Sequence, residues 1–248
     1  AYTGPTTVVC SVANGCGGIA GNAGYLMPSA KVNGAIKCQQ ISGGDGYATM
    51  GDGTQTYMFS FGPLSGLADI ASGQPGTEFP SVFNTLAPSP LSPGDPAATT
   101  DGGGSFGFNG AVGLAPDLDY GGAIDGHVDP RPIMDVGVMN GNIPAPLMAI
   151  DEDDEFFLTL SNVGMIMRPD LFEQHTVHFH GYPNASAFYD GVPDASVAIN
   201  IGGSFTYYYL APDAGTYFYH CHISPPEHLQ MGMVGQIYVR PRQDRVTG

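Results

Sequence analysis

The chain has few basic residues, and this shortage restricts the partners that it can bind. Seven lysines and arginines stand against 23 aspartates and glutamates in 248 residues, which gives a formal net charge of −16. A nucleic-acid-binding face needs basic side chains to displace counterions from phosphates. We therefore expect no nucleic acid partner, and anionic membrane surfaces are disfavoured for the same reason. An acidic surface attracts cations or basic proteins instead.

Long apolar runs are also lacking, and cysteines are few. No run reaches the roughly 18 apolar residues that a membrane-spanning helix needs, so we expect no membrane span. The first residue is Ala1, and no signal peptide precedes it, as in a processed or recombinant form. Three of the four cysteines, Cys10, Cys16 and Cys38, lie near the start. One disulfide among them, with its pairing open, favours an oxidising compartment. We expect a secreted or periplasmic protein.

Uninterrupted stretches for long helices are rare, because the chain contains 37 glycines and 21 prolines. Short strands joined by turns fit this composition better, which indicates an all-β protein. The pattern changes near residue 130. Residues 1–130 are predicted to be a loop-rich, Gly/Pro-rich N-terminal region, either an arm or a degenerate β domain, with residues 72–123 richest in these breakers. Residues 131–248 are predicted to be a single second domain.

The second half of the chain reads as a series of short strands. Their aromatic and β-branched residues and their even spacing predict a Greek-key β-sandwich. The expected strands are 146–150, 156–160, 175–181, 204–209, 215–220 and 235–239. The acidic connection Asp151–Glu155 is expected to be a solvated turn, and a role in gathering metal ions is the alternative.

Six of the seven histidines fall between residues 175 and 228. The first three lie in one predicted strand. Neighbouring side chains of a strand point to opposite faces, and residues two apart share a face. His178 and His180 therefore project to one side. His175, three residues before His178, projects to the other.

The same alternation occurs in a second predicted strand, where Cys221 stands between two histidines. His220 and His222 share one side, and Cys221 faces the opposite side. If the two strands are neighbours, two separate sites result. One contains His175 and Cys221, and the other contains four imidazoles.

The loop after Cys221 supplies further ligands for the first site. His228 follows Cys221 by seven residues and Met233 follows His228 by five. Two imidazoles, one thiolate and a weak axial thioether form the trigonal set of a blue-copper site. Met231 is the alternative axial ligand. Zinc is the competing metal, but zinc needs neither a methionine nor a linked second cluster.

At this point the sequence resembles a known superfamily. Residues 133–241 resemble a cupredoxin domain of the multicopper oxidases and copper nitrite reductases. The segments 140–146, 190–193 and 215–222 carry the resemblance, and the last of them is highly specific. Residues 45–62 resemble an opening strand only faintly.

The resemblance implies copper as the cofactor and assigns ligands by position. The type 1 ligands would be His175, Cys221, His228 and Met233. The other histidines would be a type 2 ligand, His178, and type 3 ligands, His180, His220 and His222. Electrons from a donor would enter at the type 1 copper and leave through Cys221 and the histidines on either side of it.

One departure from the oxidase pattern has a consequence for assembly. The oxidases surround their copper cluster with eight histidines from two domains, whereas this chain offers four. The cluster could form only where two chains meet, so the resemblance implies a homo-oligomer. The leading function is a multicopper-oxidase-like oxidoreductase that reduces dioxygen. Its electron donor would be a small molecule, a metal ion or a redox protein.

Two alternatives stay open. A nitrite-reductase-like enzyme would hold a lone type 2 copper between subunits, with His180 and His220 as two ligands and His127 as the possible third. His178 and His222 depart from that pattern, and His127 is otherwise an ordinary surface residue. The second alternative is a non-catalytic blue-copper electron carrier or extracellular assembly subunit.

Overall fold

The computed structural model describes residues 36–66, 137–182 and 186–241, together with positions 70, 73, 76 and 77. Short strands dominate this part of the chain. In chain order its main elements are β1 (Ile36–Thr49), β2 (Gln55–Pro63), β3 (Met148–Asp151), β4 (Glu155–Gly164), β5 (His178–Phe179), η4 (Ala187–Tyr189), β6 (Ser204–Leu210), β7 (Gly215–His220), α5 (Pro225–Met231) and β8 (Val234–Arg240). The predicted all-β class is confirmed.

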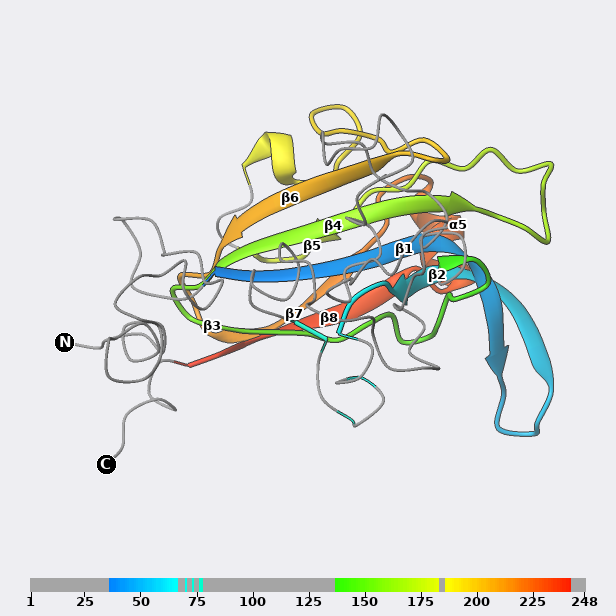
Figure 1. The fold of residues 1–248 in the computed structure, drawn as a ribbon, viewed down its shortest axis with the longest axis horizontal. Helices are drawn as coiled ribbons and strands as arrows, with labels where there is room; N and C mark the ends of the chain where they lie inside the picture. Colours follow the sequence, from blue (N-terminus) through cyan, green and yellow to red (C-terminus); the bar gives the residue numbers. More distant parts are fainter. Residues whose placement is uncertain are drawn as a thin grey trace, which may run out of the picture.

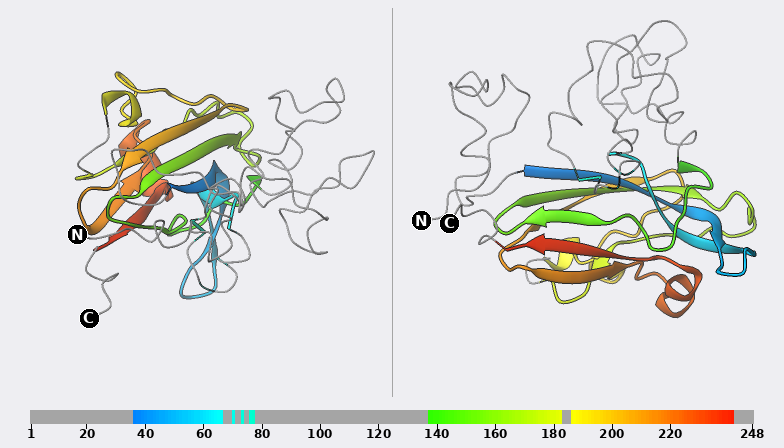
Figure 2. Two further views of the ribbon diagram at one scale, coloured as in Figure 1. Left: turned by 60° about the vertical axis from the view of Figure 1, so that its left-hand side comes forward. Right: turned by 90° about the horizontal axis from the view of Figure 1, so that it is seen from below.

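The strands form two four-stranded sheets packed as two layers (Figures 1 and 2). One sheet has the order β2-β1-β4-β6, and the other has the order β3-β8-β7-β5. Strand β8 alternates buried and exposed residues, as a strand with one face on the core should. Nearly every residue of β4 is buried, and this strand lies between β1 and β6 in its sheet.

Aromatic side chains fill the space between the layers. The largest fully buried side chains include three tyrosines, and each hydroxyl has a hydrogen-bond partner, which offsets the cost of burying it. Tyr219 donates to the carbonyl of Pro146 at 2.6 Å, and Tyr209 donates to that of Tyr189 at 2.9 Å. The hydroxyl of Tyr207 accepts a hydrogen bond from the backbone N–H of Val177 at 3.0 Å, immediately beside the histidine-rich segment.

The sandwich crosses the boundary that the sequence places near residue 130. Strand β1 pairs in parallel with β4, with Ile41 opposite Leu160, and antiparallel with β2. Residues 36–63 therefore complete a sheet with strands of the second half. Cys10, Cys16, His127 and most of residues 72–123 lie outside the described residues.

The glycines of β1 weaken the sequence signal for a strand. Gly43, Gly44 and Gly46 interrupt its β-forming pattern, yet each sits where another group comes close. A Cβ at Gly46 would lie 2.4 Å from the backbone oxygen of Gly141, and the N–H of Gly141 donates to the carbonyl of Asp45 at 3.1 Å. Gly46 lets the segment at 140–142 lie directly on the β1–β2 hairpin.

The expected strands appear with shifted ends. The predicted 175–181 strand is reduced to β5, and His175 makes an isolated bridge to Ile199. The acidic connection after β3 is not the solvated turn that we expected. Asp154 is fully buried and accepts a hydrogen bond from the backbone N–H of Asp151 at 2.9 Å. The guanidinium of Arg240 pairs with Asp151 at 2.8 Å.

Among the described residues, no helix has both the length and the apolar character needed to cross a membrane.

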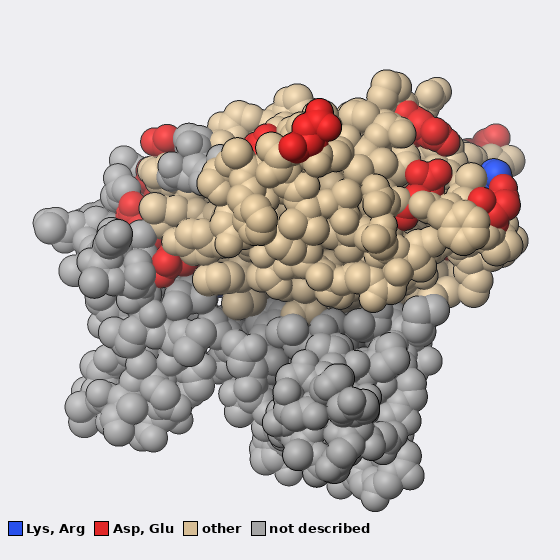
Figure 3. Space-filling model, turned by 90° about the horizontal axis from the view of Figure 1, so that it is seen from above, with Lys and Arg blue, Asp and Glu red and all other residues tan. Residues whose placement is uncertain are grey.

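The acidic composition is visible on the surface. Figure 3 shows acidic side chains spread over one face, with basic side chains nearly absent from it.

We predict that Gly62→Ala lowers the free energy of unfolding by about 1–3 kcal/mol, the usual cost of overpacking. A Cβ at Gly62 would lie 2.3 Å from the backbone oxygen of Asn140, so the two segments would have to separate. Urea unfolding followed by circular dichroism measures the loss. Gly51→Ala is the matched control, because a Cβ there would meet nothing within 4 Å. Equal stability of the two variants would contradict the close contact.

Candidate metal centre

Two groups of potential metal ligands lie at the end of β7. Strand β5 pairs antiparallel with β7, which places His178 opposite His220. Cys221 follows directly after β7 and turns into the sandwich. One group is His175, Cys221 and His228, and the other is His178, His180 and His220; within each group one ligand atom per residue lies within 4.8 Å of the others. The structure thus brings His175, Cys221 and His228 together in one group and His178, His180 and His220 in another.

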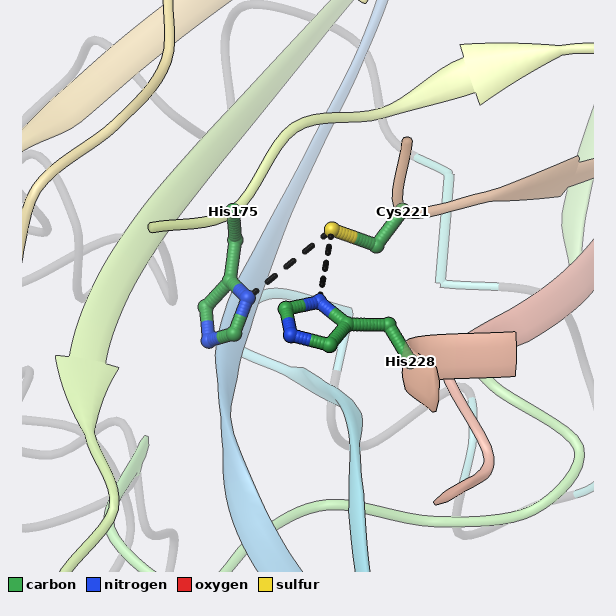
Figure 4. Close-up of side chains that lie close together, drawn as sticks. All are labelled: His175, Cys221 and His228. Carbon is green, nitrogen blue, oxygen red and sulfur yellow. Dashed lines mark hydrogen bonds between the residues drawn. The ribbon is translucent and has the colours of Figure 1, made fainter. Parts of the chain in front are cut away.

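In the first group, two ring nitrogens approach one sulfur (Figure 4). The Nδ1 atom of His228 lies 3.2 Å from Sγ of Cys221, and Nδ1 of His175 lies 3.9 Å from it. All three residues are fully buried. The rings of the two histidines meet edge to face with centroids 5.3 Å apart, so both present Nδ1 to the same point.

Thr176 connects this group to the strand that carries Cys221. Its backbone N–H donates to Sγ of Cys221 at 3.4 Å, and its hydroxyl accepts from the backbone N–H of His222 at 3.0 Å. A hydrogen bond to sulfur stabilises negative charge there, so this contact favours the thiolate. The alternation of histidines and cysteine does not single out Thr176. The only sequence signal for this residue is its position directly after His175.

Different elements position the two rings. His175 exchanges two backbone hydrogen bonds with Ile199, and its ring packs on Gly43, where a Cβ would lie 2.8 Å from Cδ2. His228 lies on α5, and its ring meets the ring of Phe59 edge to face at 5.8 Å. Glu173, which our sequence analysis did not single out, lies with Oε2 3.3 Å from Nε2 of His228. This carboxylate fixes the ring with Nδ1 toward the sulfur.

The chain returns from α5 to the sulfur through Gly232 and Met233. Gly232 has φ of 119°, a left-handed conformation suited to glycine, and ends the helix. Met233 is fully buried, and its carbonyl accepts a hydrogen bond from the N–H of Cys221 at 3.2 Å. Met231, the alternative axial ligand, is the last residue of α5. Assignment of the axial position to Met233 stays a prediction.

The first group suits a metal ion that prefers soft ligands. Burial, with a contribution from His228, lowers the pKa of His175 to about 3, so its ring is neutral. Nε2 of His175 is buried and has no hydrogen-bond partner within the described part of the chain. Burial raises the pKa of Cys221 to about 11, so only a bound cation would bring the thiolate into the neutral range. Two neutral imidazoles and one sulfur fit copper.

The second group lies toward the surface. His178 donates from Nδ1 to the carbonyl of Asp190 at 2.6 Å, and His220 donates from Nδ1 to that of Cys221 at 2.7 Å, since a carbonyl can only accept. A neutral ring that donates from Nδ1 leaves Nε2 unprotonated, as in metal-binding histidines. Nε2 of His180, an exposed residue, lies 2.8 Å from Nε2 of His220.

His222 stands at the edge of the second group. Its ring lies 5.0 Å from that of His178 and 5.6 Å from that of His220, measured between centroids, but it is not one of the three residues whose ligand atoms lie within 4.8 Å. Burial, assisted by the neighbouring rings, lowers the pKa of His220 to about 4. Like charges would repel in this cluster, so a neutral, metal-binding state is favoured.

Acidification is predicted to destabilise the metal-free protein. The pKa of His175 is about 3 in the folded chain against the ordinary 6.5, so below about pH 6.5 the unfolded chain binds a proton that the folded chain does not. Stability is therefore complete above that pH and decreases as the pH falls toward about 3. Urea midpoints measured between about pH 7 and pH 5 test this. In His175→Gln the decrease should be smaller, and an unchanged slope would contradict the assignment.

Comparison with known proteins identifies relatives of this domain. Residues 125–244 match the model of a family described as multicopper oxidase. Laccase abr2 of Aspergillus fumigatus is 33% identical over 109 residues, which are 43% of this chain and 17% of the relative. Laccase-1 of Emericella nidulans is 36% identical over 111 residues, 42% of this chain and 16% of the relative.

A copper-containing nitrite reductase of Rhizobium meliloti is 35% identical over 114 residues, 44% of this chain and 27% of the relative. The chain thus covers less than a third of the length of each of these curated relatives. Both branches of the superfamily that the histidine and cysteine motifs resemble are represented, and the predicted Greek-key cupredoxin sandwich is consistent with them. Residues 125–244 of this chain are thus similar to the multicopper oxidase family.

Proposed function

We propose that this chain is a copper-dependent oxidoreductase with a type 1 copper held by His175, Cys221 and His228, and with Met233 as the axial ligand. The observation that carries the proposal is the convergence of two Nδ1 atoms on one buried sulfur, at 3.2 and 3.9 Å. Copper bound there would supply one-electron redox chemistry. The laccase and nitrite reductase names of the relatives support the same reaction class.

The protein's own contribution is to hold these ligands in a fixed geometry and to exclude water from them. The three residues and Met233 are fully buried, so water does not reach the donor atoms. The isolated bridge at His175, the N–H of Thr176 and the carboxylate of Glu173 hold the donor set in place from three directions. A site held in this way changes little between oxidation states, which favours rapid electron transfer.

The second group of histidines is proposed to hold further copper, of type 2 or type 3, where two copies of the chain meet. His178, His180, His220 and His222 form a partly exposed cluster rather than a closed cage, and additional ligands from a partner copy would complete it. Since His220 and His222 flank Cys221 in the chain, a covalent path of adjacent residues joins the two sites. We propose dioxygen as the acceptor and a small molecule, a metal ion or a redox protein as the donor.

A nitrite-reductase-like function is the second candidate. The 2.8 Å approach of Nε2 of His180 to Nε2 of His220 favours a single copper between these two rings. A third ligand would come from a neighbouring chain. The relative from Rhizobium meliloti, a copper-containing nitrite reductase, supports this candidate. A secreted or periplasmic location and a homo-oligomer are parts of both proposals.

Copper content and assembly mass together distinguish these functions. One copper per chain in a monomer would indicate a blue-copper carrier, and two per chain with a type 2 signal in electron paramagnetic resonance would indicate the nitrite-reductase-like site. Additional copper in an oligomer indicates the oxidase. Oxygen uptake with a phenolic or metal-ion donor, compared with nitrite consumption, then identifies the acceptor.

Cys221→Ser is predicted to abolish the blue colour of the oxidised, copper-loaded protein, because a hydroxyl cannot replace the thiolate as a soft ligand. Visible absorption measures the result. Cys38→Ser, in β1, is the matched control and should keep the colour. In the wild type, copper should also protect Cys221 from alkylation, which peptide mass spectrometry detects. A colourless wild type with an alkylated Cys221 would refute the type 1 site.

His178→Ala is predicted to lose oxygen reduction and keep the blue colour. His178 belongs to the second group and faces away from Sγ of Cys221, so the substitution removes a ligand of the second site alone. An oxygen electrode and visible absorption measure the two properties on the same sample. An unchanged rate of oxygen uptake would rule out the second site as the place of oxygen reduction.

A further inference from the structure

The proposed type 1 ligands are closed off from solvent, so an electron from outside must cross other side chains to reach them. His175, Cys221, His228 and Met233 are fully buried. The ring of His228 meets that of Phe59 at a centroid distance of 5.8 Å. Phe59 is itself buried, which raises the question of what connects it to the surface.

A row of aromatic rings continues from Phe59 along the β1–β2 hairpin. Phe59 and Tyr57 are two residues apart in β2 and share a face, and their rings meet edge to face at 5.9 Å. Tyr57 lies opposite Tyr47 in the antiparallel register, with ring centroids 5.8 Å apart. Tyr47 is 43% exposed. The row therefore connects solvent to His228 through rings in near contact.

Tyr57 has a built-in proton acceptor. Its hydroxyl donates to Oδ2 of Asp45 at 3.1 Å. Asp45 is fully buried, and its Oδ2 also accepts from the backbone N–H of Met167 at 2.8 Å. Oδ1 of Asp45 has no hydrogen-bond partner among the described residues, so the carboxylate has an unused acceptor site. Unpaired buried polar atoms are rare and call for an explanation.

In the resting protein Tyr57 is a neutral phenol whose hydroxyl donates a hydrogen bond to Asp45. Burial, with the charge and hydrogen bond of Asp45, raises the pKa of Tyr57 well above its ordinary value. The phenol therefore gives up its proton only when it also loses an electron. The carboxylate that would accept this proton is already within hydrogen-bond distance.

We propose that Tyr57 is a redox-active tyrosine, paired with Asp45 as its proton acceptor, that relays electrons from the surface at Tyr47 to His228. This inference rests on the proposed copper site. With copper bound, one electron from Tyr57 would pass by way of Phe59 and His228 and reduce the cupric ion to the cuprous state, and the phenolic proton would move to Asp45. A one-electron reductant at the surface then returns an electron to the phenoxyl radical, and Asp45 returns the proton.

A second tyrosine–carboxylate pair provides a matched control. The hydroxyl of Tyr208 donates to Oε1 of Glu155 at 2.8 Å. This pair lies at the start of β4, the opposite end of the sheet from the β1–β2 hairpin and α5 (Figure 1). The ring of Tyr208 contacts those of Phe157 and Tyr189, outside the row that leads to His228. This pair has the same functional groups as Tyr57 and Asp45, but it lies in a different part of the sheet.

The first experiment follows bleaching of the blue colour after oxidised, copper-loaded protein is mixed with a small one-electron reductant in a stopped-flow instrument. Tyr57→Phe should slow the bleaching, and Tyr208→Phe should leave it unchanged. Asp45→Asn should slow it as well, and the wild-type rate should fall in deuterated water because a proton moves with the electron. Thermal unfolding of each variant confirms that it is folded.

The second experiment needs no copper. Metal-free protein is photo-oxidised with a ruthenium sensitiser, and the phenoxyl radical is measured by electron paramagnetic resonance. The signal should fall in Tyr57→Phe and in Asp45→Asn and persist in Tyr208→Phe.

Equal radical yields in Tyr57→Phe and Tyr208→Phe would overturn the assignment of Tyr57, whatever the state of the copper site. Equal bleaching rates in blue wild-type and blue Tyr57→Phe protein would overturn the relay while the copper site stands. Failure of the wild type to turn blue would instead refute the proposed function, and the relay with it.

Discussion

The pairing of β5 with β7 is the constraint on which the sites depend. It places His178 opposite His220 at the end of both strands. Because successive residues of an extended chain point to opposite sides, Cys221 turns toward one side while the histidines on either side of it turn toward the other. One short segment therefore serves a buried site and a partly exposed site at the same time.

Burial then gives the two sites different chemistry. Around Cys221 the removal of water holds the histidines neutral and the thiol protonated, so that a cation is needed to create the thiolate. Around His178 and His220, carbonyl groups hold Nδ1 and leave Nε2 for a ligand bond. The first site is closed, as suits electron transfer. The second can meet another chain or a small molecule.

The β1–β2 hairpin contributes more than an additional pair of strands. Its Gly43 makes room for the ring of His175, and its Phe59 packs against His228. The same hairpin carries Tyr57 and Asp45. The part of the chain with the weakest β pattern thus supports both imidazoles of the proposed type 1 site and supplies the proposed electron route.

The sequence by itself determined the ligand alternation, since the position of Cys221 between two histidines follows from the period of an extended strand. The Gly- and Pro-rich composition also indicated the all-β class, and the motif resembled the superfamily. Only the tertiary structure decided what lies beside the ligands. Glycines lower strand propensity, so β1 was not recognisable, although close packing requires glycine there. Glu173, Phe59 and Tyr57 reach the site through side-chain contacts between distant segments, and no local pattern encodes such contacts.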